Sequence, residues 1–207
     1  MKALVIGGTL FIGKRLVKRL IEEGHEVTVF HRQGMHGYGD EVGNLVGDRN
    51  DPESVRRAIG EQRFDWVFDN VYDWERGTTA EQVEGTARAF GDGIQRYVFM
   101  SSCAAYGEGL DLTEDRPLVP DDSPEPYSAQ KAASERALFR MHRDEGFPAV
   151  TLRPPFVYGP DNPFYREAFF WDRMRDDRMI IVPGDGSRLM HLVFVNDLVE
   201  ACLLAAS

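Results

Sequence analysis

The beginning of the chain constrains the fold more than any other part, because an apolar segment, a glycine turn and a helical pattern follow one another directly. Residues 3–6 are uniformly apolar, as is typical of a strand that a parallel sheet buries on both faces. Gly7 and Gly8 begin the turn, residues 10–23 repeat apolar side chains at helical spacing, and Gly24 suits a helix C-terminus. This order predicts the first half of a parallel βαβ unit.

The alternation of strands and helices continues as far as residue 152. It indicates an α/β fold with a parallel, doubly wound sheet, so we assign residues 1–160 to a dinucleotide-binding domain of the Rossmann type. The predicted strands are residues 26–30, 44–46, 66–68, 96–100 and 149–152, and the predicted helices begin at residue 51 and span 78–90 and 127–145.

The pattern changes after Pro160. We interpret residues 161–207 as a small, partial substrate region. In it, a strand near residues 180–182 and a last helix from Asp197 are expected to return to the core domain.

The charge balance limits the choice of partners. Asp and Glu number 34 against 24 Lys and Arg, and the net charge of −10 disfavours nucleic acid or an anionic membrane surface. No apolar run approaches the roughly 20 residues that span a bilayer. Two cysteines make no disulfide framework, and the five histidines show no metal-ligand spacing. We therefore expect a cytoplasmic protein with a small-molecule substrate and no metal.

The glycine turn is suited to a phosphate group. Glycines let backbone N–H groups approach a pyrophosphate at a helix N-terminus, where the helix dipole favours negative charge. The alternative is a tight turn that serves only close packing of the helix on the strand. We predict dinucleotide contacts from Gly7, Gly8, Thr9, Leu10, Phe11, Ile12 and Gly13.

The turn GGTLFIG resembles that of the extended branch of the short-chain dehydrogenase/reductase superfamily, which includes nucleotide-sugar epimerases and dehydratases. Gly7 and Gly13 match the outer glycines of its G-x-x-G-x-x-G pattern, and Leu10 replaces the middle one. That departure is similar to the atypical branch that contains the chloroplast stem-loop RNA-binding proteins. The likeness continues through residues 153–160, 184–186 and 193–198.

The extended branch usually carries a longer C-terminal substrate lobe, most of which this sequence lacks. The resemblance therefore implies one of two situations. Either the sequence is a fragment, or its pocket is small and is completed by a partner or left open.

Three residues form the predicted catalytic set. Tyr127 and Lys131 lie four apart at the start of a predicted helix, so the ammonium can approach the phenol. A nearby cation lowers the pKa of a tyrosine from about 10, so that it can exchange a proton near neutral pH. Ser102 follows a predicted strand at the position that the resemblance assigns to the family's catalytic serine or threonine, where it would bind the substrate oxygen. The alternative for Ser102 is a cap at the strand end.

The end of the second strand bears on cofactor choice. NAD-preferring domains usually place a carboxylate there, which binds the ribose and repels a 2′-phosphate. His31 stands at that position, and Arg32 follows with a guanidinium suited to phosphate. We predict NADP, with NAD as the alternative if Arg32 points to solvent and His31 binds the ribose. Further predicted cofactor contacts are Asp48, Asn70, Lys131, Pro154 and Pro155.

Departures from the family pattern narrow the reaction. Family dehydratases carry an Asp-Glu pair directly after the catalytic hydroxyl residue, where this chain has Cys103 and Ala104, so dehydration is disfavoured. Phe156 replaces the asparagine that nucleotide-sugar epimerases use, which weakens the case for a UDP-sugar. The remaining prediction is an epimerase or reductase that transfers hydride at an alcohol or ketone carbon of a carbohydrate or related small molecule.

Two alternatives use the same fold. One is a protein that senses a dinucleotide without catalysis, which would have no need of the serine, tyrosine and lysine. The other is an RNA-binding protein, which the acidic charge disfavours. The resemblance also predicts a homodimer in which residues 78–90 and 127–145 of two chains pack together.

Overall fold

A six-stranded parallel sheet forms the centre of the computed structural model, which describes residues 1–207 apart from the side chain of Asp92. The strand order is β3-β2-β1-β4-β5-β6, so the chain returns to the middle of the sheet after β3 and builds outward again. The doubly wound α/β fold predicted from the sequence is thus confirmed. The strands are β1 (Lys2–Ile6), β2 (Glu26–His31), β3 (Gly43–Val46), β4 (Trp66–Asp69), β5 (Arg96–Met100) and β6 (Ala149–Leu152).

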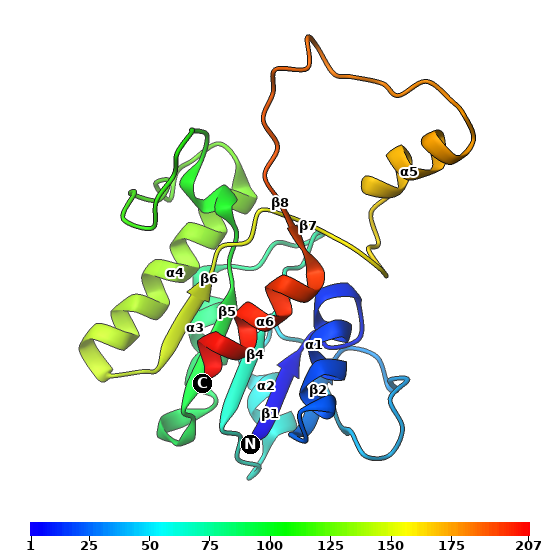
Figure 1. Ribbon diagram of the computed structural model, residues 1–207. Helices are drawn as coiled ribbons and strands as arrows, with labels where there is room; N and C mark the ends of the chain where they lie inside the picture. Colours follow the sequence, from blue (N-terminus) through cyan, green and yellow to red (C-terminus); the bar gives the residue numbers. More distant parts are fainter.

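Helices cover both faces of this sheet (Figure 1). Each face has its own apolar layer, because strands buried on both sides alternate their side chains between the two. One layer lies beneath α1 (Phe11–Glu22) and α6 (Val195–Ala206), and the other beneath α2 (Pro52–Ile59), α3 (Ala80–Arg88) and α4 (Pro126–Glu145). Two short 3₁₀ helices are η1 (Gly91–Gly93) and η2 (Cys103–Tyr106).

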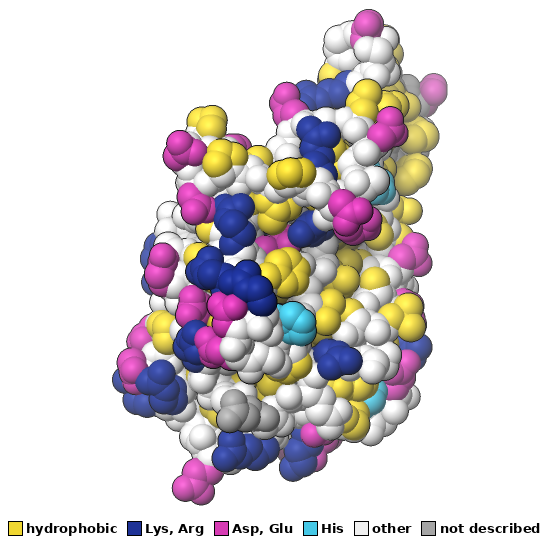
Figure 2. Space-filling view, turned by 90° about the vertical axis from the view of Figure 1, so that its left-hand side faces the viewer, with side chains coloured by type: hydrophobic (Ala, Val, Ile, Leu, Met, Phe, Trp, Pro, Cys, Tyr) yellow, Lys and Arg dark blue, Asp and Glu magenta, His cyan; other side chains and the backbone are white. Residues whose placement is uncertain are grey.

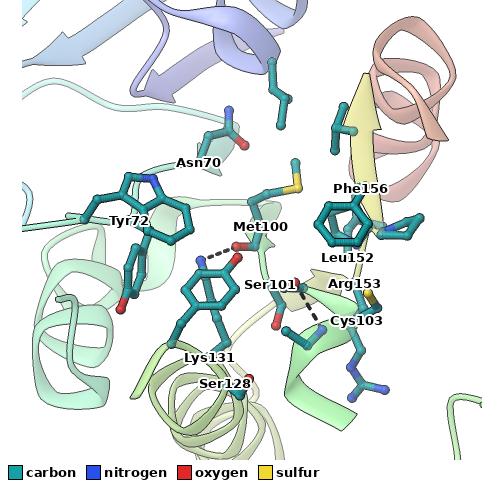
Figure 3. A pocket seen from close by; sticks show the side chains of 18 of the residues that line it. Asn70, Tyr72, Met100, Ser101, Cys103, Ser128, Lys131, Leu152, Arg153 and Phe156 are labelled. Atoms are coloured by element: carbon teal, nitrogen blue, oxygen red, sulfur yellow. Dashed lines mark hydrogen bonds between the residues drawn. The ribbon is translucent and has the colours of Figure 1, made fainter. Parts of the chain in front are cut away.

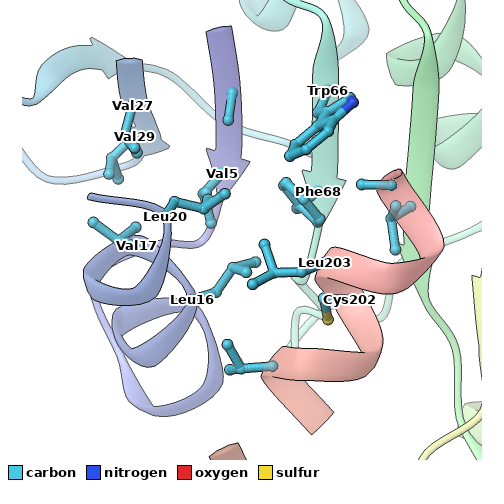
Figure 4. Packing of buried hydrophobic residues seen from close by; sticks show 14 of the residues in the cluster. Val5, Leu16, Val17, Leu20, Val27, Val29, Trp66, Phe68, Cys202 and Leu203 are labelled. Carbon is cyan, nitrogen blue, oxygen red and sulfur yellow. The ribbon is translucent and has the colours of Figure 1, made fainter. Parts of the chain in front are cut away.

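The first layer joins the two ends of the sequence. Leu16 and Leu20 of α1 pack with Cys202 and Leu203 of α6 over β1 and β4 (Figure 4). The last helix, expected from residue 197, begins two residues earlier. Its buried side chains make it part of the core around the sheet.

One predicted strand is wrong. Residues 180–182 form no strand; they are irregular and exposed, and Ile181 keeps 58% of its accessible surface. The strand of this region is β8 (Leu192–Phe194), which pairs in parallel with β7 (Phe156–Tyr158). An apolar run favours a strand only where a neighbouring strand supplies hydrogen bonds and packing, and among the described residues β7 does this for β8 alone.

The segment between β7 and β8 projects away from the sheet, as the orange part of Figure 1 shows. It contains α5 (Glu167–Arg175), none of whose described residues is buried. The loop that follows α5 exposes further apolar side chains, among them Met179, Val182 and Leu189.

Candidate active site

A continuous cleft of about 3020 Å³ runs along the carboxyl ends of the strands. Gly7 after β1, Asn70 after β4 and Ser102 after β5 all line it. In open parallel sheets, ligands bind at this edge where the strand order reverses, which here lies between β1 and β4.

The glycine turn follows β1 and therefore lies where the strand order reverses. Gly7 has φ of +82°, and a Cβ on Gly13 would lie 2.0 Å from the Gly7 carbonyl oxygen. The start of α1 therefore touches the turn directly, which a larger residue at position 13 would prevent. Thr9 and Ile12 also line the cleft.

The N-terminus of α1 is open to a ligand. Leu10 precedes the helix without a side-chain cap, and no acidic residue lies in the first turn. The first backbone N–H groups of a helix have no partner within it, so an anion is favoured there. The Leu10 side chain keeps 60% of its surface exposed, and Phe11 enters the helix with φ of +41°, a strained value for a non-glycine residue.

Gly8, one of the predicted dinucleotide contacts, lies differently from the other residues of the turn. Gly8 does not belong to the described lining of the cleft, because it faces the apolar layer under α1. A Cβ there would come within 2.9 Å of Val17 and 3.0 Å of Val29. Gly8 is therefore a packing position, and its carbonyl accepts a hydrogen bond from Tyr38. Its predicted contact with a dinucleotide stays a prediction.

The helix α4 brings two of the predicted catalytic residues to the cleft. Glu125 caps its first turn by accepting the N–H of Ser128, so the helix begins just before Tyr127. Lys131 follows one turn later and is buried. Its ammonium donates to the carbonyl of Met100 at 2.6 Å, as Figure 3 shows.

The surroundings of Tyr127 shift its pKa. Burial raises the pKa of its phenol, while the neighbouring Ser102 hydroxyl and the positive charge of Arg166 oppose that rise. The Lys131 ammonium lies 5.9 Å from the centre of the Tyr127 ring and is bound to a backbone carbonyl. Desolvation therefore prevails in the protein without cofactor, and the predicted lowering by Lys131 together with the charge of a bound nicotinamide stays a prediction.

Aromatic side chains account for this burial. Trp74 stacks on Tyr127 with ring centres 5.0 Å apart and planes at 21°, and Tyr72 meets it edge-on at 4.7 Å. Both residues come from the loop after β4, which the sequence interpretation did not single out. Burial likewise lowers the pKa of Lys131 to about 8.

Ser102 has a capping role and keeps a hydroxyl proton that it can donate. Its hydroxyl oxygen accepts the N–H of Ala104 at 3.2 Å and so caps η2. A hydroxyl that accepts through its oxygen still has a proton to donate. Ser102, Tyr127 and Lys131 thus line one end of the cleft together, while their catalytic roles stay predictions.

A buried ion pair behind this site was missed by the sequence interpretation. Glu135 is fully buried and accepts hydrogen bonds from Ser101 and, at 2.9 Å, from Arg153 Nε. Arg153 also donates to the Tyr106 hydroxyl at 2.6 Å, which ties η2 and β6 to α4. The available signal was the four-residue spacing of Tyr127, Lys131 and Glu135, which puts all three on one helix face.

The end of β2 lines the cleft at His31 and Arg32. The His31 ring is buried and its Nε2 lies 2.7 Å from Asn44 Oδ1, while its Nδ1 has no partner among the described residues, so the predicted ribose contact stays a prediction. Arg32 is 66% exposed, and its Nη1 lies 3.3 Å from the Asp73 carboxylate. Arg32 therefore lines the cleft as predicted, but it already has an acidic neighbour.

A second arginine completes this charged cluster. Arg76 donates to both Asp73 and Asp48, at 2.9 Å in the latter case. Although partial burial opposes ionisation, the N–H of Asn50 and the Arg76 guanidinium hold the pKa of Asp48 below its usual value. Asp48 lines the cleft with its carboxylate already paired.

The other predicted cofactor residues face the middle of the cleft. The side-chain nitrogen of Asn70 is buried without a partner among the described residues, and Figure 3 shows it beside the open pocket. Pro154 and Pro155 line the opposite wall, next to Cys103. Burial raises the pKa of the Cys103 thiol, which makes it a poor acid.

No helix in the described part of the chain is both long enough and apolar enough to cross a membrane.

Comparison with known proteins identifies related sequences and folds. The profile of a family described as "NAD dependent epimerase/dehydratase family" matches residues 3–207. The chain is 31% identical to the chloroplast stem-loop binding protein of 41 kDa b from Arabidopsis thaliana, over 98% of this chain and 54% of that protein. It is 30% identical to the 2-alkyl-3-oxoalkanoate reductase of Stenotrophomonas maltophilia, over 99% of this chain and 65% of that protein.

Solved structures share the fold over the whole chain. One is the UDP-N-acetylglucosamine 4-epimerase of Methanobrevibacter ruminantium in complex with UDP-N-acetylmuramic acid. Its TM-score is 0.83 at 23% identity, over 99% of this chain and 72% of the other. The chain spans about half to two thirds of the length of the curated relatives named above.

Proposed function

The chain belongs to the NAD dependent epimerase/dehydratase family, and from that premise we propose that it binds a nicotinamide dinucleotide and transfers hydride at an alcohol or ketone carbon of a carbohydrate or related small molecule. One observation carries the proposal. Ser102, Tyr127 and Lys131 line the same cleft as the glycine turn and the open N-terminus of α1. A reductase among the relatives is consistent with this chemistry.

The residues along the cleft fit a dinucleotide. The approach of Gly13 to Gly7 leaves backbone N–H groups at the start of α1 for a pyrophosphate. The unpartnered side-chain nitrogen of Asn70 supplies a donor farther along, toward Lys131 and Pro154. When bound, the nicotinamide ring supplies or accepts the hydride.

The residues of the chain handle the proton. Tyr127 gives a proton to the substrate oxygen during reduction, and takes it back during oxidation. Its raised pKa keeps the phenol protonated at neutral pH, which is the form that reduction of a ketone requires. Ser102 donates a hydrogen bond to the same oxygen, and Lys131 supplies positive charge beneath it.

NADP is the cofactor that we propose, with NAD as the alternative. The end of β2 carries no carboxylate, and the exposed Arg32 guanidinium lies at the mouth of the cleft. Because Asp73 competes for that guanidinium, the expected preference is modest. An Arg32→Ala variant should bind NADP several-fold more weakly and NAD unchanged, with the difference shrinking at high salt. Tighter binding of NAD by the unaltered protein at low salt argues against NADP, and Arg57→Ala, on the exposed side of α2, is the control.

The test of function is hydride transfer. Purified protein is supplied with reduced or oxidised dinucleotide and a panel of ketones and alcohols, and the absorbance of the reduced nicotinamide is followed. Tyr127→Phe should lower turnover at least about 100-fold, as expected for loss of a general acid, while dinucleotide affinity stays nearly unchanged. Tyr165→Phe, which removes a hydroxyl bound to Asp172 outside the cleft, should leave turnover intact.

The same assay separates the two reaction types. A reductase consumes one dinucleotide per product, whereas an epimerase inverts its substrate without net change in the dinucleotide. Activity of Tyr127→Phe close to that of the unaltered protein would contradict the assignment.

Binding of a nucleic-acid stem-loop is a second candidate, favoured by the likeness to the Arabidopsis protein. Electrophoretic mobility shifts with stem-loop RNA at several salt concentrations test it. Binding that falls steeply with salt and survives Tyr127→Phe supports this alternative.

A further inference from the structure

Arg166 lines the cleft and lies over two aromatic rings. Its guanidinium carbon is 4.6 Å from the ring centre of Phe164 and 5.2 Å from that of Phe156. Among the residues that the structure describes, it has no carboxylate oxygen within 4.0 Å, whereas Lys14 and Arg175 in the same region are paired. Two aromatic rings hold the group in place, and its hydrogen-bonding edge stays open.

The acidic residue next to Arg166 in the sequence forms its hydrogen bonds with other groups. Glu167 follows Arg166 directly, but its carboxylate accepts the N–H of Gly159 at 2.9 Å and the side-chain amide of Asn162, also at 2.9 Å. Arg153, another arginine that lines the cleft, is bound to the buried Glu135. Arg166 is therefore a cation in this part of the cleft that remains available to a ligand.

Arg166 and Tyr127 line the same cleft. It lines the cleft together with Phe156, which lies across the pocket from Tyr72 in Figure 3. The positive charge of Arg166 opposes the rise in the pKa of the Tyr127 phenol. Phe164, whose ring Arg166 covers, meets Trp74 edge-on with ring centres 6.3 Å apart, and Trp74 stacks on Tyr127. An anion held at Arg166 would therefore lie at the same end of the cleft as Tyr127.

We propose that Arg166 is a specificity-determining residue, which binds a carboxylate of the substrate close to the alcohol or ketone that reacts. The planar guanidinium matches a planar carboxylate through two parallel hydrogen bonds. The inference rests on the proposed function for its reaction, and names hydroxy and oxo acids as the substrate class.

The test measures binding, so that it does not depend on turnover. Calorimetry follows the binding of 2-, 3- and 4-hydroxyhexanoate, and of their methyl esters, to the full chain loaded with dinucleotide. At least one acid should bind about 10-fold or more tightly than its ester, the factor expected for a charged hydrogen-bonded pair. Arg166→Gln should remove this preference and leave the affinity for the ester and for the dinucleotide unchanged.

A matched control is present on α5, the helix that follows Arg166. Arg173 also lies over a ring, 5.0 Å from the centre of Phe169, but outside the lining of the cleft. Arg173→Gln should keep the preference for the acid. Acetate should compete with the bound acid more effectively than inorganic phosphate does.

Three results would overturn the inference. They are equal binding of every acid and its ester, a preference for acids that survives Arg166→Gln, and stronger competition by phosphate than by acetate. Absence of binding by the whole panel also counts against it. Because hydride transfer is measured separately, an acid preference that depends on Arg166 in a protein without turnover would refute the proposed function alone.

Discussion

Lys131 shows how a single buried charge shapes the site. Its ammonium is surrounded by the rings of Phe99, Tyr72 and Tyr127, at 4.7, 5.4 and 5.9 Å from the ring centres, and is bound to one carbonyl. Burial lowers its pKa from 10.5 to about 8, so the protein holds this charge at an energetic disadvantage near neutral pH. A binding partner that accepts hydrogen bonds from the ammonium would relieve that disadvantage.

The lowered pKa predicts a pH dependence of stability. Between pH 8 and 10.5 the unfolded chain keeps the proton on Lys131 and the folded chain loses it. The unfolded state then binds more protons, so the free energy of unfolding rises with pH in this window, by up to about 1.4 kcal/mol per pH unit. Lys131→Met removes this contribution.

Urea unfolding of the protein without cofactor provides the measurement. The stability of the unaltered protein minus that of Lys131→Met should increase as the pH rises from about 8 to about 10. Other titrating groups cancel in this difference. A difference that stays constant would show that the ammonium is hydrated or paired in solution.

At the scale of secondary-structure elements, two helix ends position the site. The N-terminus of α1 is left open by Leu10, whereas α4 is capped by Glu125 and starts with Pro126. The first arrangement leaves backbone donors for a ligand, and the second fixes where Tyr127 lies relative to the sheet. We propose that the N-terminus of α1 binds the dinucleotide and that the N-terminus of α4 orients Tyr127.

Gly13→Ala tests the contact between α1 and the glycine turn. The added Cβ would lie 2.0 Å from the Gly7 carbonyl oxygen, and a backbone atom cannot move aside as a side chain can. The helix must shift, so we expect a loss of about 1–3 kcal/mol in the free energy of unfolding and a loss of dinucleotide binding of at least about 10-fold.

Gly37→Ala is the matched control, because a Cβ there meets no atom within 4 Å. Thermal unfolding and dinucleotide titration are measured for both variants. A Gly13→Ala protein with unchanged melting temperature and affinity would show that the turn does not pack on the helix in this way.

On the scale of the whole molecule, the outer face of α3 and α4 is available for association. Arg88 of α3 forms ion pairs at this surface with Glu84 of the same helix and with Glu145 of α4, and the second pair links the two helices. Charges of both signs mix on the side of the molecule that carries α4, as Figure 2 shows. Phe139 of α4 is 40% exposed and lines the cleft together with Ala149 and Val150 of β6, and we expect it to provide an apolar contact point for a second copy.

We expect a homodimer that packs α3 and α4 of both chains together. Sedimentation velocity should give a dimer for the unaltered protein and a monomer for Phe139→Asp, since a buried, unpaired carboxylate is costly at an interface. Leu204→Asp changes an exposed leucine of α6 on the other side of the sheet and should leave the dimer intact. A monomer at high concentration of the unaltered protein would disprove this assembly.

Local pattern was enough to predict the sheet, the glycine turn and the start of α4. Each of these depends on residues adjacent in the sequence: an apolar strand, glycines before a helix, and a tyrosine and a lysine one helical turn apart. Such local motifs favour the same local structure whatever the rest of the chain does. The family resemblance rests on the same short motifs, and the match over residues 3–207 confirms it.

Contacts between distant residues decided the rest. Strand β8 forms at residues 192–194 because β7 lies beside it, and the apolar residues 180–182 have no such neighbour among the described residues. The pKa of Tyr127 rises because Trp74, more than fifty positions earlier, covers its ring. Asp73 meets Arg32 across forty-one positions, and Glu135 meets Arg153 across eighteen. The sequence names the residues that pair but does not give the distances between them. Charge pairing and desolvation depend on those distances, so only the tertiary structure decides them.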